Sequence, residues 1–217
     1  VEFSDWTAEL RAREDELEAH FEAQLCSDES PVDPLRFAAE IRDFVDEDTI
    51  LIGDGGDIVA QASKVIPVRT PNGWMDPGPL GTLGVGMPFA LAAQHSFPDR
   101  KVLIIYGDGA FGLNGFEYDT AVRFGLPIVG IVGNDAAWGQ MLRPQVGLYG
   151  ADRKVAVDLA ETRYDRVVEA LGGLGEFCQR PEEIRPALER AFASGRPALV
   201  NVMIRKDEGA PKGSTYV

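Results

Sequence analysis

The chain has 217 residues, of which 35 are acidic and 21 are Lys or Arg, and its formal net charge is −14. This length suits one α/β domain with a substantial core. The sequence has no basic run that would bind nucleic acid or an anionic membrane, and no apolar run long enough to span a bilayer. Its two cysteines are isolated and no secretory signal is visible, so we expect reduced thiols and a cytoplasmic location.

The amino-terminal segment is acidic, and its apolar side chains recur at helical spacing: Trp6, Leu10, Leu17, Phe21 and Leu25. This pattern predicts an amphipathic helix, and we expect residues 1–33 to link the chain to an upstream domain. A helix over residues 34–45 and a strand over residues 49–53 then begin the compact fold.

The middle of the chain predicts a strand, a helix and a parallel strand over residues 101–106, 116–124 and 127–132. After Trp138 come a helix and an irregular stretch, helices over residues 163–171 and 181–193, and a closing strand over residues 198–204. The alternation predicts an α/β fold in which a doubly wound parallel sheet, over residues 34–204, has helices on both faces. Residues 205–217 form a polar tail.

Carboxylates follow both strands of the central unit: Asp108 comes after the first and Asp135 after the second. Ligands bind at the carboxyl ends of such strands, and a glycine-rich loop before a helix offers N–H donors to a phosphate. Asp108 would repel a phosphate unless a cation lay between them. The sequence therefore predicts Mg²⁺ or Ca²⁺ bridging the protein and a diphosphate.

Gly107-Asp108-Gly109, followed about 25 residues later by Asn134-Asp135, resembles the thiamine diphosphate motif of the pyruvate oxidase, acetolactate synthase and oxalyl-CoA decarboxylase superfamily. Residues 73–93 resemble the loop and helix that precede this motif in the family, and residues 52–57 resemble its first diphosphate loop. The resemblance implies that the chain binds thiamine diphosphate through Mg²⁺.

By this resemblance the metal ligands are Asp108, Asp135 and the backbone carbonyl of Ala137. The family has Asn where this chain has Asp135, so a negative charge is added beside the diphosphate. Leu83 matches the apolar wedge that holds the cofactor in its bent, reactive conformation. The residues that the resemblance places at the cofactor are Gly56, Asp57, Leu83, Gly107, Gly109, Ala110, Asn134, Trp138 and Gly139.

The resemblance makes the chain the carboxyl-terminal third of a longer enzyme that forms homodimers or homotetramers. An amino-terminal pyrimidine-binding domain, usually of a neighbouring subunit, supplies the catalytic glutamate in that family, so the active site is expected to be incomplete here. Residues 74–79 and 133–136 are most similar to 2-hydroxyacyl-CoA lyases. These enzymes cleave a 2-hydroxyacyl-CoA to an aldehyde or ketone and formyl-CoA, or form it from them. One alternative is an acetolactate synthase-like or benzaldehyde lyase-like enzyme acting on free 2-keto or 2-hydroxy compounds, and another is a non-catalytic cofactor-binding subunit.

The polar tail carries cations in an otherwise acidic protein, and the resemblance implies that it closes over an acyl-CoA substrate. The residues expected to meet the substrate are Arg205, Lys206, Lys212 and Tyr216. The alternative for the tail is a solvated chain end.

The glycine motif also has a second interpretation. Gly107, Gly109 and Gly112 fit the spacing of a dinucleotide fingerprint, with Asp135 on a ribose hydroxyl. That interpretation leaves Asp108 without a role.

Overall fold

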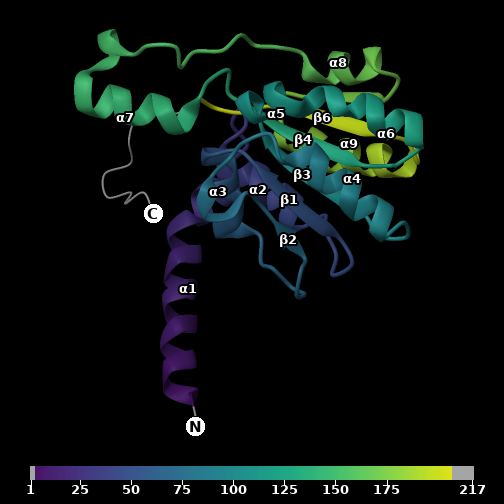
Figure 1. Ribbon diagram of the computed structural model, residues 1–217. Helices are drawn as coiled ribbons and strands as arrows, with labels where there is room; N and C mark the ends of the chain where they lie inside the picture. Colours follow the sequence, from purple (N-terminus) through teal and green to yellow (C-terminus); the bar gives the residue numbers. More distant parts are fainter. Residues whose placement is uncertain (1–2, 207–217) are drawn as a thin grey trace.

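The computed structural model describes residues 3–206, and its centre is a six-stranded sheet in the order β2-β1-β3-β4-β6-β5 (Figure 1). Every neighbouring pair of these strands is parallel. The strands are β1 Ile50–Asp54, β2 Trp74–Met75, β3 Val102–Gly107, β4 Val129–Asn134, β5 Leu174–Cys178 and β6 Ala198–Met203. The predicted doubly wound parallel sheet is confirmed.

Helices cover both faces of the sheet (Figure 1). The helices are α1 Ser4–Leu25, α2 Pro34–Arg42, α3 Asp57–Val65, α4 Gly86–Ser96, α5 Asp108–Asn114, α6 Tyr118–Phe124, α7 Gly139–Tyr149, α8 Tyr164–Ala170 and α9 Ile184–Ala193. Successive β3 side chains point to opposite sides: Leu103 packs in the core with α2, α3 and α9, and Ile104 in the core with α4, α6 and α8. A strand buried on both faces explains the continuous apolar runs of the sequence.

Helix α1 is present as predicted, but it extends away from the body of the fold (Figure 1). None of its residues is buried against the described part of the chain, and Trp6 and Leu10 are 61% and 41% exposed. Its carboxyl-terminal end lies beside α2. The linker role of residues 1–33 stays a prediction.

Three elements differ from the sequence prediction. The helical segment expected over residues 116–124 begins much earlier, because α5 starts at Asp108 and a 3-10 turn, Gly115–Glu117, leads from it into α6. Helix α3 follows the diphosphate loop directly, where the sequence predicted only the loop. Strand β5 was missed because it lies at the sheet edge and is mostly half-buried, so it lacks the apolar run of the central strands.

The order of the strands brings the ends of β1, β3 and β4 together. Asp54 lies opposite Tyr106 in the register of β1 and β3, and Gly107 lies opposite Gly133 in that of β3 and β4. Loops that are far apart in the sequence therefore meet at the carboxyl-terminal ends of these strands. Among residues 3–206, no helix is long and apolar enough to cross a membrane.

Candidate functional site

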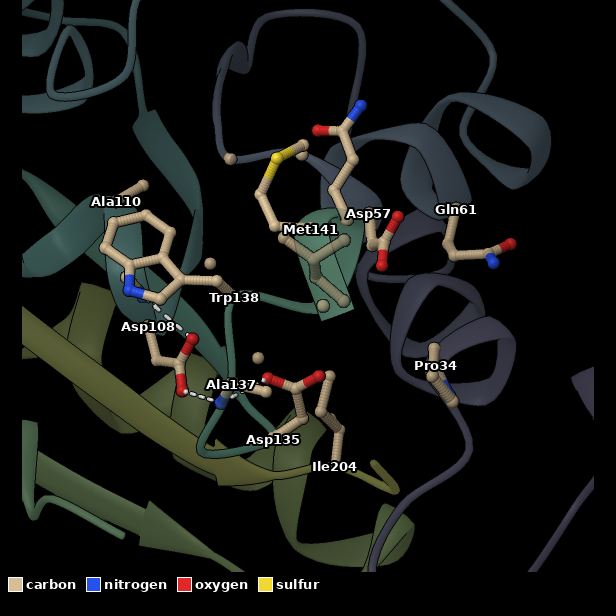
Figure 2. Close-up of a pocket in the computed structure, with 18 of the residues that line it drawn as sticks. Pro34, Asp57, Gln61, Asp108, Ala110, Asp135, Ala137, Trp138, Met141 and Ile204 are labelled. Atoms are coloured by element: carbon tan, nitrogen blue, oxygen red, sulfur yellow. Dashed lines mark hydrogen bonds between the residues drawn. The ribbon is translucent and has the colours of Figure 1, made fainter. Parts of the chain in front are cut away.

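A cavity of about 340 Å³ lies at the carboxyl ends of β1, β3 and β4 (Figure 2). It contains most of the residues that the sequence singled out. The predicted cofactor residues that line it are Gly56, Asp57, Leu83, Gly107, Gly109, Ala110, Trp138 and Gly139, and the predicted metal ligands Asp108, Asp135 and Ala137 line it as well. The parallel strands thus bring these residues into one cavity, although Gly56 and Gly139 are 83 positions apart in the sequence.

The two acidic side chains converge on one backbone N–H. Asp108, the first residue of α5, is 2% exposed, and its Oδ2 accepts from the Ala137 N–H at 3.3 Å. Asp135 Oδ1 accepts from the same N–H at 3.2 Å, so the two carboxylates flank it (Figure 2). The other Asp108 oxygen accepts from Gly109 N at 2.7 Å. The turn after β4 therefore orients both carboxylates into the cavity.

Burial raises the pKa of both carboxyl groups above the usual value. Desolvation raises the pKa of Asp108 to about 6. It also raises the pKa of Asp135 to about 7, to which the charges of Asp108 and Asp57 contribute. A cation beside the pair would stabilise both ionised forms.

The oxygen atoms of the pair suit a hard divalent cation. Among residues 3–206, no three His, Cys, Asp or Glu side chains are grouped as a metal site. A cation here would therefore complete its coordination with a backbone carbonyl, such as that of Ala137, and with oxygens from a ligand or water. The donor set fits a cation shared between the protein and a phosphate.

Glycines form the floor of the cavity. A Cβ on Gly55 would lie 2.9 Å from Gly107 N, and one on Gly109 would lie 2.6 Å from the Trp138 ring. A Cβ on Gly139 would lie 2.7 Å from Asp57 Oδ2. A side chain at any of these positions would force its neighbour to move, and the bare backbone allows a phosphate to come close to it.

Asn134 does not line the cavity, in contrast to the other predicted cofactor residues. Its side-chain amide is fully buried and donates to Thr162 O at 2.9 Å and to Asn201 Oδ1 at 3.2 Å. Its Oδ1 accepts from Ala136 N at 3.2 Å. The Asn134 side chain thus fixes the turn that carries Asp135, and Ala136 takes a left-handed conformation with φ of 54°.

Helix α7 adds cavity residues that the sequence reasoning missed, including Gln140, Met141 and Arg143. Arg143 is 9% exposed and forms an ion pair with Asp57 at the start of α3. In the sequence, the feature that could have pointed to this residue is an arginine four positions after Gly139, within the helix predicted there. The ion pair joins the predicted diphosphate loop, residues 52–57, to α7, the helix that follows Asp135.

The cations at the start of the tail form ion pairs with other parts of the chain. Arg205 lines the cavity and contacts Glu29 at 2.6 Å and Asp33 at 2.7 Å. Lys206 contacts Asp158 at 2.7 Å and does not line the cavity. A substrate phosphate would have to compete with these carboxylates. The other two predicted substrate residues, Lys212 and Tyr216, lie outside the described residues.

The dinucleotide interpretation of the glycine motif conflicts with this geometry. The helix that would offer its N-terminus to a pyrophosphate is α5, and Asp108 is its first residue. A buried carboxylate at that position opposes direct binding of an anion.

The parallel sheet, the glycine residues of the cavity and the acidic pair suit a domain that binds a diphosphate ligand. Residues 54–202 match the family described as the thiamine pyrophosphate enzyme, C-terminal TPP binding domain, and the chain belongs to this family. The predicted binding of thiamine diphosphate is supported by this membership.

The chain is similar to two groups of enzymes. It is 42% identical over 210 residues to the acetolactate synthase large subunit IlvG of Mycobacterium tuberculosis, covering 96% of this chain and 38% of that protein. It is also 42% identical over 215 residues to 2-hydroxyacyl-CoA lyase 2 of Caenorhabditis elegans, covering 94% of this chain and 33% of that protein. The chain thus spans about a third of the length of these relatives.

Among solved structures, the fold is similar to a thiamine diphosphate-dependent 4-hydroxybenzoylformate decarboxylase of Rhodococcus jostii RHA1, with a TM-score of 0.75. The sequence identity is 24%, and the match covers 82% of this chain and 33% of that one. At this identity the similarity concerns the fold.

Proposed function

We propose that the chain is the diphosphate-binding and metal-binding part of a thiamine diphosphate-dependent carbon–carbon lyase. The observation that carries the proposal is the convergence of Asp108 and Asp135 on one N–H, in a cavity that Leu83 also lines. The substrate we propose is a 2-hydroxyacyl-CoA, which is cleaved to, or formed from, an aldehyde or ketone and formyl-CoA.

In this proposal the carboxylates of Asp108 and Asp135 and the carbonyl of Ala137 would hold Mg²⁺. The charge of Asp135 strengthens attraction to the cation but adds repulsion toward the diphosphate. Two cations line the same cavity, Arg143 and Arg205, and both are paired with carboxylates. Because those carboxylates already balance the charge of both arginines, the proposed Mg²⁺ would have to compensate the extra repulsion.

The glycine floor would admit the diphosphate to backbone donors, and Gly56, Asp57 and Gly139 lie at the meeting point of the two loops that form it. Leu83 would support the bent cofactor, and Trp138, packed over Gly109, would fix the wall beside it. The bound cofactor supplies the electron sink for the carbanion that carbon–carbon cleavage produces. The chain's own residues would position the cofactor and exclude water.

A complete site would also need the pyrimidine-binding domain with its catalytic glutamate. We propose that this domain comes from the remainder of the same enzyme or from a partner subunit, and that the assembly is a homodimer or homotetramer. The length of the relatives, about three times that of the matched region, supports this proposal.

A lyase that uses CoA esters is one of two functions that the relatives favour. The identity to a 2-hydroxyacyl-CoA lyase 2 supports it, and the equal identity to an acetolactate synthase supports a carboligase acting on free 2-keto acids. We favour the lyase because of the resemblance of residues 74–79 and 133–136 to such lyases.

CoA dependence separates the two functions. The complete enzyme, with thiamine diphosphate and Mg²⁺, should be assayed with a panel of 2-hydroxyacyl-CoA esters, the corresponding free 2-hydroxy acids, and pyruvate. Formyl-CoA production from the esters alone is the expected result. Acetolactate formation from pyruvate without CoA would instead identify a synthase, and cofactor binding without any turnover would identify a non-catalytic subunit.

We also propose that the tail closes over the acyl-CoA substrate. Arg205 is the described tail residue that lines the cavity, and its pairs with Glu29 and Asp33 would be exchanged for contacts with substrate phosphates. Lys206, Lys212 and Tyr216 complete the proposed substrate contacts.

A further inference from the structure

The loop that carries Leu83 is held by a buried carboxylate from the neighbouring strand. Asp54, the last residue of β1, is fully buried and uses its two oxygens separately. Oδ1 accepts from Gly84 N at 2.9 Å and Oδ2 accepts from Gly86 N at 2.7 Å. These N–H groups belong to the first and third residues after Leu83, so Asp54 fixes the backbone immediately beside the leucine.

The opposite side of the same peptide segment is held by Asn114. This residue ends α5, the helix that Asp108 begins, and its Nδ2 donates to Gly84 O. Gly84 has φ of 87°, and a Cβ on it would lie 3.0 Å from Asn114 Nδ2. Its N–H and its carbonyl are therefore both bound, one to β1 and the other to α5. We call these contacts of Asp54 and Asn114 the Gly84 clamp.

The clamp depends on a carboxylate that is fully buried. Burial raises the pKa of Asp54, so the ionised carboxylate has a cost. The backbone N–H groups of Gly86, Gly84 and Val85 act in the opposite direction and lower it. A carboxylate is the side chain that can offer an acceptor oxygen to each of two N–H groups in this arrangement. An asparagine would present an N–H donor to one of them, leaving two donors face to face.

We propose that Asp54 and Asn114 are positioning residues that set the place of Leu83 in the cavity relative to the helix that begins at Asp108. The Gly84 clamp thereby connects Leu83, the proposed support of the cofactor, to the helix that carries Asp108, the proposed metal ligand. This inference rests on the proposed function, because it assigns the clamp to the binding of a cofactor in the cavity that Leu83 and Asp108 both line.

The test compares Asp54→Asn and Asn114→Ala with a control on α4, the helix whose first residue, Gly86, donates to Asp54. Gln94 is 2% exposed and donates to Phe97 O, Pro98 O and Arg100 O at the other end of α4. Gln94→Ala therefore loosens α4 at the end that does not meet the cavity. Asn114 is exposed, so its variant should fold even if Asp54→Asn does not.

Three measurements follow on each protein. The first is amide hydrogen exchange of residues 82–86 in the cofactor-free chain, which both clamp variants should accelerate. The second is the affinity for thiamine diphosphate with Mg²⁺, which should stay within about threefold of wild type. The third is the exchange rate of the thiazolium C2 proton on the complete enzyme, which should fall about tenfold, the rate equivalent of one lost hydrogen bond.

The control Gln94→Ala should lower the melting temperature and leave the C2 exchange rate unchanged. Wild-type C2 exchange in both clamp variants, with the cofactor bound, would overturn the inference. Loss of C2 exchange in the control to the same degree would also overturn it, because general loosening of α4 would then explain the effect. Failure of the wild-type enzyme to bind thiamine diphosphate is a different result, which would refute the proposed function.

Discussion

Burial of the Asp135 carboxylate, together with its repulsion from Asp108, should make the metal-free protein more stable when Asp135 is changed to Asn. The substitution keeps the shape of the side chain and the Oδ1 that accepts from Ala137 N at 3.2 Å. It removes a carboxyl whose pKa is raised to about 7 by burial and by the charge of Asp108. The expected change is therefore a gain, although the substitution lies in the proposed metal site.

The sign and size follow from proton linkage. The folded state holds a proton on Asp135 that the unfolded state, with a carboxyl pKa near 3.8, has released, so stability falls as pH rises from 4 to beyond 7. At about 1.4 kcal/mol for each tenfold change, the raised pKa of Asp135 costs the fold about 4 kcal/mol at pH 8, where the buried carboxylate is charged, and about 2 kcal/mol at pH 5, where folding must take up a proton. Asp135→Asn should be more stable than wild type by about these amounts.

Urea denaturation in EDTA at pH 5 and pH 8 measures both differences. Asp99 is an exposed carboxylate after α4, and Asp99→Asn is the matched control, which should leave the stability at either pH close to that of wild type. A wild-type protein as stable as Asp135→Asn at pH 8, or an advantage that does not grow from pH 5 to pH 8, would refute the reasoning.

The remaining predictions concern the cofactor. Asp135→Asn should retain Mg²⁺-dependent binding of thiamine diphosphate in calorimetry, because an amide oxygen still serves a hard cation, and complete loss of binding would show that the charge is required. Leu83→Ala should reduce turnover of the complete enzyme more than stability; a full core-type loss of about 2–5 kcal/mol with normal turnover per folded molecule would contradict the supporting role. Gly109→Ala should weaken cofactor binding, because its Cβ would lie 2.6 Å from the Trp138 ring and displace the cavity wall, and unchanged affinity would argue against a close approach there.

The acidic pair could be predicted from sequence because each carboxylate directly follows a strand that is buried along its length. Leu103, Ile104 and Ile105 belong to β3, which ends at Gly107 directly before Asp108. The next strand, β4, ends at Asn134 directly before Asp135. The apolar runs of such strands identify them reliably, and the parallel arrangement then brings their ends together. The position of both acids in one cavity follows from these two facts.

The supporting residues could not be predicted, because their partners are distant in the sequence. Asp54 and Gly84 are 30 positions apart, as are Gly84 and Asn114, and the pair of Asp57 and Arg143 spans 86 positions. Neither a period nor a local motif marks such contacts. They depend on which loops the sheet order places side by side.

The start of α5 escaped prediction for a different physical reason. Its sequence contains Gly109 and Gly112, which disfavour a helix by about 1 kcal/mol each relative to alanine. Tertiary packing compensates, since the Phe111 ring contacts the rings of Tyr106, Tyr118 and Tyr164 at centroid distances of 5.0–6.1 Å. Local propensity and packing disagree here, and packing determines the structure.

The central claim is that a divalent cation on Asp108 and Asp135 joins the diphosphate to this chain, and calorimetric titration of thiamine diphosphate tests it most directly. The titration compares wild type with Asp108→Ala, each in Mg²⁺ and in EDTA. We predict that wild type binds only when Mg²⁺ is present and that Asp108→Ala does not bind in either condition, because the diphosphate would then meet uncompensated negative charge. Equal affinity of Asp108→Ala and wild type, with the same dependence on Mg²⁺, would contradict the claim.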